Sequence, residues 1–88
     1  MLDFRCEPGT IELKITLPEG RSAEQLIDQL VKEVNELPIE EFHGQILLIN
    51  GRVTTPMAAF IGHYFAHICK EVKFYVPMEK AYVKAVWH

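Results

Sequence analysis

Apolar and polar residues alternate at the start of the chain, which is the two-residue period of a β-strand. The alternation covers residues 2–6 and returns over 11–17. Between these runs stands Glu7-Pro8-Gly9, a turn signal. The pattern predicts two strands joined as a hairpin, the first of them half-buried because only every second residue is apolar.

A helical period follows the hairpin. Ser22 and Gln25 stand three residues apart, as in a capping box, where two side chains bond to each other's backbone N–H groups. Apolar residues then recur at helical spacing up to Val34, with charged residues on the other face. Pro38 disfavours helix at the residue before it, so this helix is expected to end near Leu37.

The second half of the chain begins with a short apolar run, Ile46-Leu47-Leu48-Ile49, which is typical of a strand covered on both faces. After a loop, Pro56 suits the first turn of a second helix, because its missing N–H is not needed there. Thr55 is the expected cap of this helix, which the apolar pattern extends to about Glu71.

Two further strands are predicted over 73–76 and 81–87, so the element order is ββαβαββ. The segment 46–76 is then a parallel crossover, which is nearly always right-handed. We therefore expect one α/β domain over 1–88, a minimal Rossmann-like domain with a small mixed sheet. Ligands of open α/β sheets bind beyond the carboxyl ends of the strands, which here is the loop 50–56.

This loop has the composition of an anion-binding site. Gly51 allows a positive φ or the close approach of a ligand, and Arg52 could clamp a phosphate or stack on a base. The N–H groups at the start of the helix attract negative charge, and Asn50, Thr54 and Thr55 add polar side chains. The alternative is an ordinary strand–helix turn, with Thr55 as the cap and Arg52 in solvent.

Two histidines lie on the second predicted helix. His63 and His67 are four residues apart, so both rings are expected on one helix face. Such a pair can share a metal ion with further ligands, or one histidine can act as a general acid or base. No glutamate follows His63 directly, which excludes the zinc-protease helix motif. The alternative is that both rings pack in an interface.

The second helix is apolar almost all round and carries a strip of small residues, Ala58, Ala59, Gly62 and Ala66. Small side chains let another backbone approach closely, so the strip is interpreted as core or dimer contact. Hydrophobic residues make up 49% of a chain of 88 residues. So short a chain cannot bury that many apolar groups alone, which predicts a homodimer or higher homo-oligomer.

Charge and targeting signals restrict the partners. The net charge of −3 argues against DNA or long RNA as a partner but allows a small anion at one positive site. No signal peptide and no membrane-spanning apolar run are recognisable, so no membrane partner is expected. Cys6 and Cys69 are expected as reduced, buried thiols of a cytoplasmic protein, although the sequence does not exclude a disulfide.

Several short motifs follow one another in a characteristic order over about residues 45–88. They are Leu48-Ile49-Asn50-Gly51-Arg52, Pro56, Gly62-His63, Ala66-His67, Tyr75-Val76-Pro77, Tyr82-Val83 and Trp87-His88. In this order and spacing the chain resembles the small manganese-dependent ring nucleases of type III CRISPR systems, which are distant relatives of the CARF domains. The first half of the chain matches that family only in the order of its elements.

The resemblance implies degradation of cyclic tetra-adenylate, the second messenger that activates type III CRISPR effectors. Dimers of that family sandwich the cyclic ligand in a larger assembly, so the active site is composite. The resemblance assigns His67 and His88 to catalysis, places Gly51 and Arg52 near the ligand, and matches His63 to the family's preceding helix histidine. It also implies manganese as a cofactor.

Two positions depart from the family pattern. The family has an acidic residue before the turn proline, where this chain has Val76, and a basic residue after it, where this chain has Met78. Valine replaces a metal ligand or general base, and methionine replaces a contact to phosphate.

Three functions therefore remain open. The chain is a ring nuclease in which a ribose 2′-hydroxyl attacks its own phosphate, a binding-only relative that buffers or senses a cyclic oligoadenylate, or a homo-oligomeric interaction module without a nucleotide.

Overall fold

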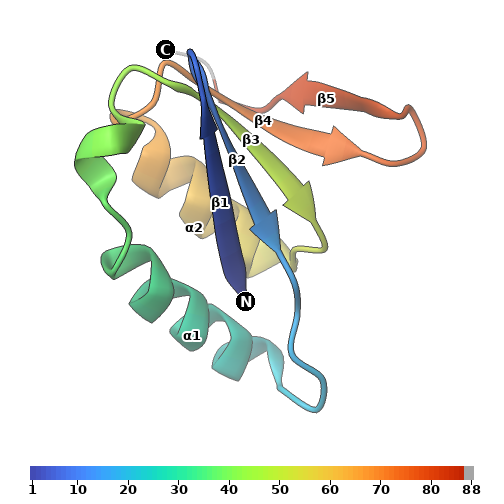
Figure 1. The fold of residues 1–88 in the computed structure, drawn as a ribbon. Helices are drawn as coiled ribbons and strands as arrows, with labels where there is room; N and C mark the ends of the chain where they lie inside the picture. Colours follow the sequence, from blue (N-terminus) through green and yellow to red (C-terminus); the bar gives the residue numbers. More distant parts are fainter. Residues whose placement is uncertain (87–88) are drawn as a thin grey trace.

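A computed structural model describes residues 1–86, which form a five-stranded mixed sheet with two α-helices (Figure 1). The strands stand side by side in chain order and are β1 (Leu2–Glu7), β2 (Thr10–Ile15), β3 (Ile46–Gly51), β4 (Glu71–Val76) and β5 (Ala81–Lys84). The three central strands are parallel, and both edge strands are antiparallel to their neighbours. The predicted α/β class and element order are confirmed.

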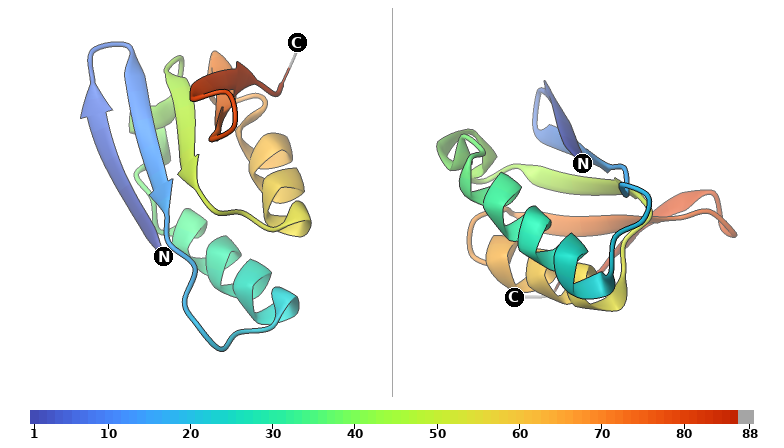
Figure 2. Two further views of the ribbon diagram at one scale, coloured as in Figure 1. Left: turned by 90° about the vertical axis from the view of Figure 1, so that its right-hand side faces the viewer. Right: turned by 90° about the horizontal axis from the view of Figure 1, so that it is seen from below.

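Both helices, α1 (Ala23–Asn35) and α2 (Thr55–Phe65), lie on the same face of the sheet (Figure 2). The two crossovers, from β2 to β3 and from β3 to β4, step across the sheet in the same direction. Right-handed crossovers that step in one direction place their helices on one side. The core therefore lies between the helices and this face.

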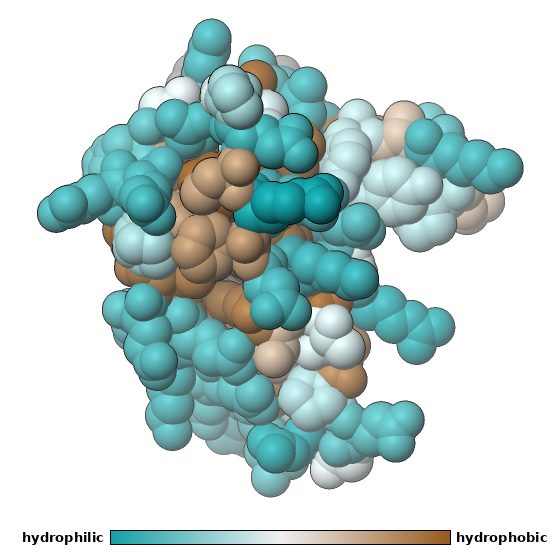
Figure 3. Space-filling model, in the orientation of Figure 1, coloured by the Kyte–Doolittle hydropathy of each residue, from teal (hydrophilic) through white to brown (hydrophobic). Residues whose placement is uncertain are grey.

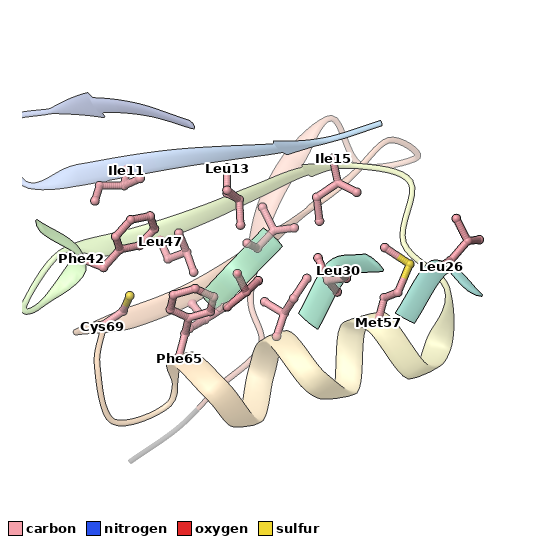
Figure 4. Close-up of a cluster of buried hydrophobic side chains, with 14 residues drawn as sticks. Ile11, Leu13, Ile15, Leu26, Leu30, Phe42, Leu47, Met57, Phe65 and Cys69 are labelled. Atoms are coloured by element: carbon pink, nitrogen blue, oxygen red, sulfur yellow. The ribbon is translucent and has the colours of Figure 1, made fainter. Parts of the chain in front are cut away.

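The core is apolar, with no buried polar or charged residue in the part of the chain that the structure describes. Every second residue of β2 and β3 points into it (Figure 4). A short 3-10 helix, η1 (Ile39–Phe42), adds a ring that the sequence pattern did not predict. Phe42 stacks on Phe65 of α2 with ring centroids 5.5 Å apart, and both are fully buried.

The apolar strand β3 is covered by helices on one face only. Leu47 and Ile49 are buried against them, whereas Ile46 and Leu48 are half-buried on the opposite, open face. There Leu48 stands beside Glu12 of β2 in the register. The expectation that β3 is covered on both faces is wrong, because neither crossover passes over the open face.

The edge strand β1 is more exposed than predicted. Five of its six residues are exposed, including Phe4. Phe4 is 39% exposed, although its ring centroid lies 5.7 Å from that of Phe42. Cys6 is also exposed. The predicted burial of both thiols is therefore right for Cys69 and wrong for Cys6, because β1 lies at the rim of the helical layer.

The start of α1 is as predicted. The Ser22 hydroxyl accepts a hydrogen bond from the Gln25 amide at 3.1 Å, and the Gln25 side chain accepts one from the Ser22 amide at 2.9 Å. The helix ends at Asn35, two residues before the expected end.

Glu33 ties α1 to the start of β1. Its carboxylate accepts hydrogen bonds from the Leu2 amide at 3.0 Å and from the Gln29 side chain at 2.8 Å, and the amino group of Met1 lies 3.6 Å away. Partial burial by itself raises the pKa of Glu33. The two hydrogen bonds and the amino group outweigh this, so the net effect is a lowered pKa.

We expect Glu33→Gln to lower the free energy of unfolding by about 1–2 kcal/mol at neutral pH, because an amide cannot accept at both positions. The folded-state pKa lies below the unfolded value of 4.5. The contribution is therefore complete above that pH and is lost as the pH falls through the folded-state pKa. Urea unfolding across this range measures it, with exposed Glu79→Gln as the control. A loss that does not depend on pH would contradict the prediction.

Candidate functional site

The loop between β3 and α2 begins at Gly51, whose φ is +111°. The predicted positive φ is therefore confirmed. What approaches this glycine is the neighbouring strand: a Cβ built on it would overlap the carbonyl oxygen of Ile15, its register partner on β2. Gly51 is thus required for strand pairing, and this requirement holds without any ligand.

The cap of α2 is Thr54, one residue earlier than predicted. Its hydroxyl oxygen accepts a hydrogen bond from the Met57 amide at 3.4 Å. Thr55 and Pro56 are then the first two helical residues, positions where a missing N–H costs no helical bond. The Thr54 oxygen is engaged in the cap, whereas Thr55 is exposed to solvent.

Arg52 is the positive charge of this loop. Its side chain is exposed and forms no ion pair with any residue from 1 to 86. The first turn of α2 contains no acidic residue, so the positive end of the helix dipole is not neutralised locally. Asn50 and its register partner Lys14 lie on the open face, whereas α2 lies on the other face of the sheet (Figure 2), so the positive part of this loop consists of Arg52 and the helix start. The arrangement is suited to an anion.

The far end of α2 differs from the prediction. The helix ends at Phe65, whose carbonyl accepts hydrogen bonds from the amides of Ile68 and Cys69 as the chain turns. The apolar pattern continues past this end because Ile68 and Cys69 still pack against the core from the turn. The helix predicted to reach Glu71 is therefore too long, and His67 lies in the turn.

The predicted histidine pair is consequently not a pair on one helix. His63 is exposed on α2, while His67 is exposed two residues beyond the end of the helix. α2 has eleven residues, which gives a length of about 16 Å. The loop with Arg52 adjoins the start of α2, and His67 follows its end (Figure 1). One chain therefore does not place His67 beside the loop.

His63 and Thr55 instead line an open groove of about 750 Å³ between α2 and the β4–β5 hairpin. Most of the other lining residues are small or apolar, namely Ala58, Ala59, Gly62, Phe74, Val76, Val83, Ala85 and Val86, together with Lys84. A Cβ on Gly62 would lie 3.8 Å from the Val86 side chain. Part of the small-residue strip is thus covered by the chain's own C-terminal segment. His88 lies outside the described residues.

Metal ligands are not gathered in the described part of one chain. No group of three or more histidine, cysteine, aspartate or glutamate residues there is placed to hold a metal ion. Burial raises the pKa of Cys69 to about 11, which keeps its thiol protonated and unsuited to metal binding at neutral pH. His63 and His67 therefore do not fit a manganese site within residues 1–86.

The two positions that depart from the family pattern lie on the β4–β5 hairpin. Val76 ends β4 and forms part of the groove wall, and Met78 in the turn keeps 96% of its surface exposed. Neither can replace an acidic or a basic group.

A polar cluster on the open face was not predicted. The Tyr82 hydroxyl of β5 donates to the Glu12 carboxylate of β2 at 3.3 Å, and Arg5 of β1 lies 3.4 Å from the same carboxylate. Partial burial and the adjacent Glu12 charge raise the pKa of Tyr82. The contact of Glu12 with Tyr82, 70 residues away, is a product of the tertiary structure.

No family model, curated protein or solved structure matches the chain. Within the described residues, no helix is long and apolar enough to cross a membrane. The fold defines a class, a small Rossmann-like α/β domain.

Proposed function

We propose that this chain binds cyclic tetra-adenylate and cleaves it, as a cytoplasmic ring nuclease in the antiviral defence of a type III CRISPR system. The ligand is suggested by the resemblance over about 45–88. The observation that carries the proposal is that Arg52 is exposed, forms no ion pair with residues 1–86 and lies next to the start of α2, whose first turn has no acidic residue. Pro56 has no N–H and the Met57 N–H donates to Thr54, so the donors that this site offers to a phosphodiester are the Arg52 guanidinium and the N–H groups of Thr54 and Thr55.

The proposed active site is shared between copies of the chain. Arg52 and His67 lie at opposite ends of α2, so a ligand that touches Arg52 of one copy must meet His67 of another. A homodimer or a higher homo-oligomer is thus part of the proposal, in agreement with the composite site that the resemblance implies.

The proposed reaction uses the ribose 2′-hydroxyl as the nucleophile. His67 or His88 takes its proton, the 2′-oxygen attacks the adjacent phosphorus, and the bond from phosphorus to the 5′-oxygen breaks. The leaving 5′-oxygen then receives a proton from the imidazolium, which leaves a 2′,3′-cyclic phosphate. Arg52 and the N–H groups of Thr54 and Thr55 stabilise the negative charge on the phosphorane. No step requires a carboxylate at Val76 or a bound metal.

Two alternative functions each have an observation in their favour. Val76 and Met78, in place of an acidic and a basic residue, favour a protein that binds the cyclic oligoadenylate without cleaving it. The apolar groove beside α2 favours an interaction module that binds no nucleotide.

The test is incubation with labelled cyclic tetra-adenylate, with and without manganese, following binding and cleavage separately. We expect Arg52→Ala to weaken binding by roughly tenfold or more, since it removes a charge-assisted hydrogen bond. His67→Ala is expected to retain binding and to slow cleavage by about a hundredfold or more. Arg21→Ala is the matched control, because this exposed arginine lies at the start of α1 and bonds to Gln29. His88→Ala tests the second candidate base.

Mixing two inactive variants tests the shared site. In a two-fold dimer, random pairing of Arg52→Ala with His67→Ala chains restores one intact site in half of the dimers, about one quarter of the wild-type rate. No recovery would indicate that one copy supplies both groups. Tight binding of an intact ligand would support the binding-only function, and absence of binding would reject both nucleotide functions.

A further inference from the structure

The outer edge of β1 has unpaired backbone groups. Met1 accepts a bond from the Thr16 amide of the β2 segment, whereas the next amide, that of Leu2, donates to the Glu33 side chain. Because peptide groups alternate along an antiparallel strand, the N–H and C=O groups of Leu2, Phe4 and Cys6 point away from β2. The register with β2 is continuous over six pairs, and the strand has no proline, lysine or bulge. Glu33 covers the edge only at the Leu2 N–H, and the outward groups of Phe4 and Cys6 have no hydrogen bond to another described residue.

The two faces of β1 differ in chemistry. Leu2, Phe4 and Cys6 lie on the helix side, since they pair with the buried alternate residues of β2. Apolar side chains gather between η1 and β1, above α1 (Figure 3). The open side of β1 carries Asp3 and Arg5 among its three charged residues. β1 therefore has an apolar row on one face and charges of both signs on the other. A second strand with the same two faces can pair with it.

The sequence of β1 is complementary to itself in one antiparallel register. With Phe4 opposite Phe4 of a second copy, Asp3 stands opposite Arg5 twice and Leu2 stands opposite Cys6 twice. The outward-pointing N–H and C=O groups of Phe4, the C=O of Leu2 and the N–H of Cys6 then form the hydrogen bonds of these pairs, whereas the Leu2 N–H already donates to Glu33. The Asp3–Arg5 pairs take the closer, non-hydrogen-bonded positions, where opposite charges are favourable.

The neighbouring registers are unfavourable. A shift by two residues in one direction places Asp3 opposite Asp3, and a shift in the other direction places Arg5 opposite Arg5. A shift by one residue pairs inward-pointing with outward-pointing peptide groups and apolar with charged side chains. Of these neighbouring registers, only the one centred on Phe4 joins opposite charges and apolar residues together.

We propose that β1 pairs with β1 of a second copy in this register and joins two five-stranded sheets into one continuous sheet. The partner is thus another copy of this chain, selected by charge as well as by backbone hydrogen bonds. This interface is argued without any nucleotide, so it stands or falls separately from the proposed activity.

Cross-linking tests the register. Leu2→Cys places a thiol opposite Cys6 of the second copy, with Cα atoms about 5.5 Å apart, a separation that a disulfide can span. We expect mild oxidation to give a covalent dimer on a non-reducing gel. Leu2→Cys combined with Cys6→Ser is the matched control and should stay monomeric on the gel, because its new thiols lie four residues out of register. Buried Cys69 is not expected to react.

Sedimentation of the nucleotide-free protein tests the dimer itself. The wild type is expected to dimerise at micromolar concentration. Asp3→Arg should raise the dissociation constant by roughly tenfold or more, because arginines then face each other at both pairs. Arg5→Asp should do the same, and the double variant should restore the dimer. A monomeric wild type, dimerisation that the charge changes do not affect, or equal cross-linking of the control would overturn the proposal.

Discussion

Replacing Gly51 by alanine is expected to lower the free energy of unfolding by about 3–5 kcal/mol, the sum of a strained positive φ and a steric overlap. Gly51 has a φ of +111°, and its new Cβ would overlap the backbone carbonyl of Ile15. A flexible side chain could move aside, but this oxygen belongs to β2. Relief of the overlap therefore requires β2 and β3 to separate at their carboxyl ends, where Ile15 pairs with Gly51.

Gly9→Ala and Gly44→Ala are matched controls for the backbone term. Both glycines have positive φ values, 82° and 74°, and a Cβ at either position would meet nothing within 4 Å. Each of these two substitutions is expected to lower the free energy of unfolding by about 1 kcal/mol. Urea unfolding monitored by circular dichroism measures all three variants. Similar losses at the three positions would show that the overlap with Ile15 is not the dominant cost.

Phe65→Ala is expected to cost about 3–5 kcal/mol, because it removes a large side chain from a fully buried position. Its ring stacks on Phe42 at 5.5 Å and meets Tyr64 edge-on at 5.0 Å. Phe65 is also the last residue of α2, and its carbonyl holds the turn that contains His67. The substitution should therefore loosen this turn as well as destabilise the fold.

Phe60→Ala on the same helix is the control, since Phe60 is only half-buried and packs at the edge of the core. Its truncation is expected to cost less than about 2 kcal/mol, in proportion to the smaller area removed from the core. Hydrogen exchange of residues 66–70, alongside urea unfolding, reports the turn. Fast exchange in Phe65→Ala but not in Phe60→Ala is the expected result. Equal protection in both variants would show that the turn does not depend on the core contacts of Phe65.

Short-range signals predicted the elements well. The Ser22–Gln25 capping box depends on two residues three positions apart, and the alternation in β2 depends on neighbours, so each can be read locally. Where two local signals compete, the predicted helix start was wrong by one residue. Thr54 and Thr55 are both capable caps, and the sequence did not show that the helix begins one residue earlier.

The candidate site was only partly predictable. The sequence correctly placed Arg52 in the loop after β3, because a strand followed by a helix fixes that order, whereas Asn50 belongs to β3 and Thr55 begins α2. It could not show that Lys14 is the neighbour of Asn50, which follows only from parallel pairing. It also placed His67 on α2, since the apolar spacing of a buried turn is indistinguishable from that of a longer helix.

The sequence by itself determined the class of fold, the element order, the strand–helix loop and the self-complementary charges of β1, because these follow from local periodicity and residue chemistry. Only the tertiary structure decided which surfaces remain open. Two crossovers in one direction left one sheet face bare, and the turn after Phe65 placed His67 beyond the end of α2. Both outcomes depend on how distant segments pack, which no local pattern encodes.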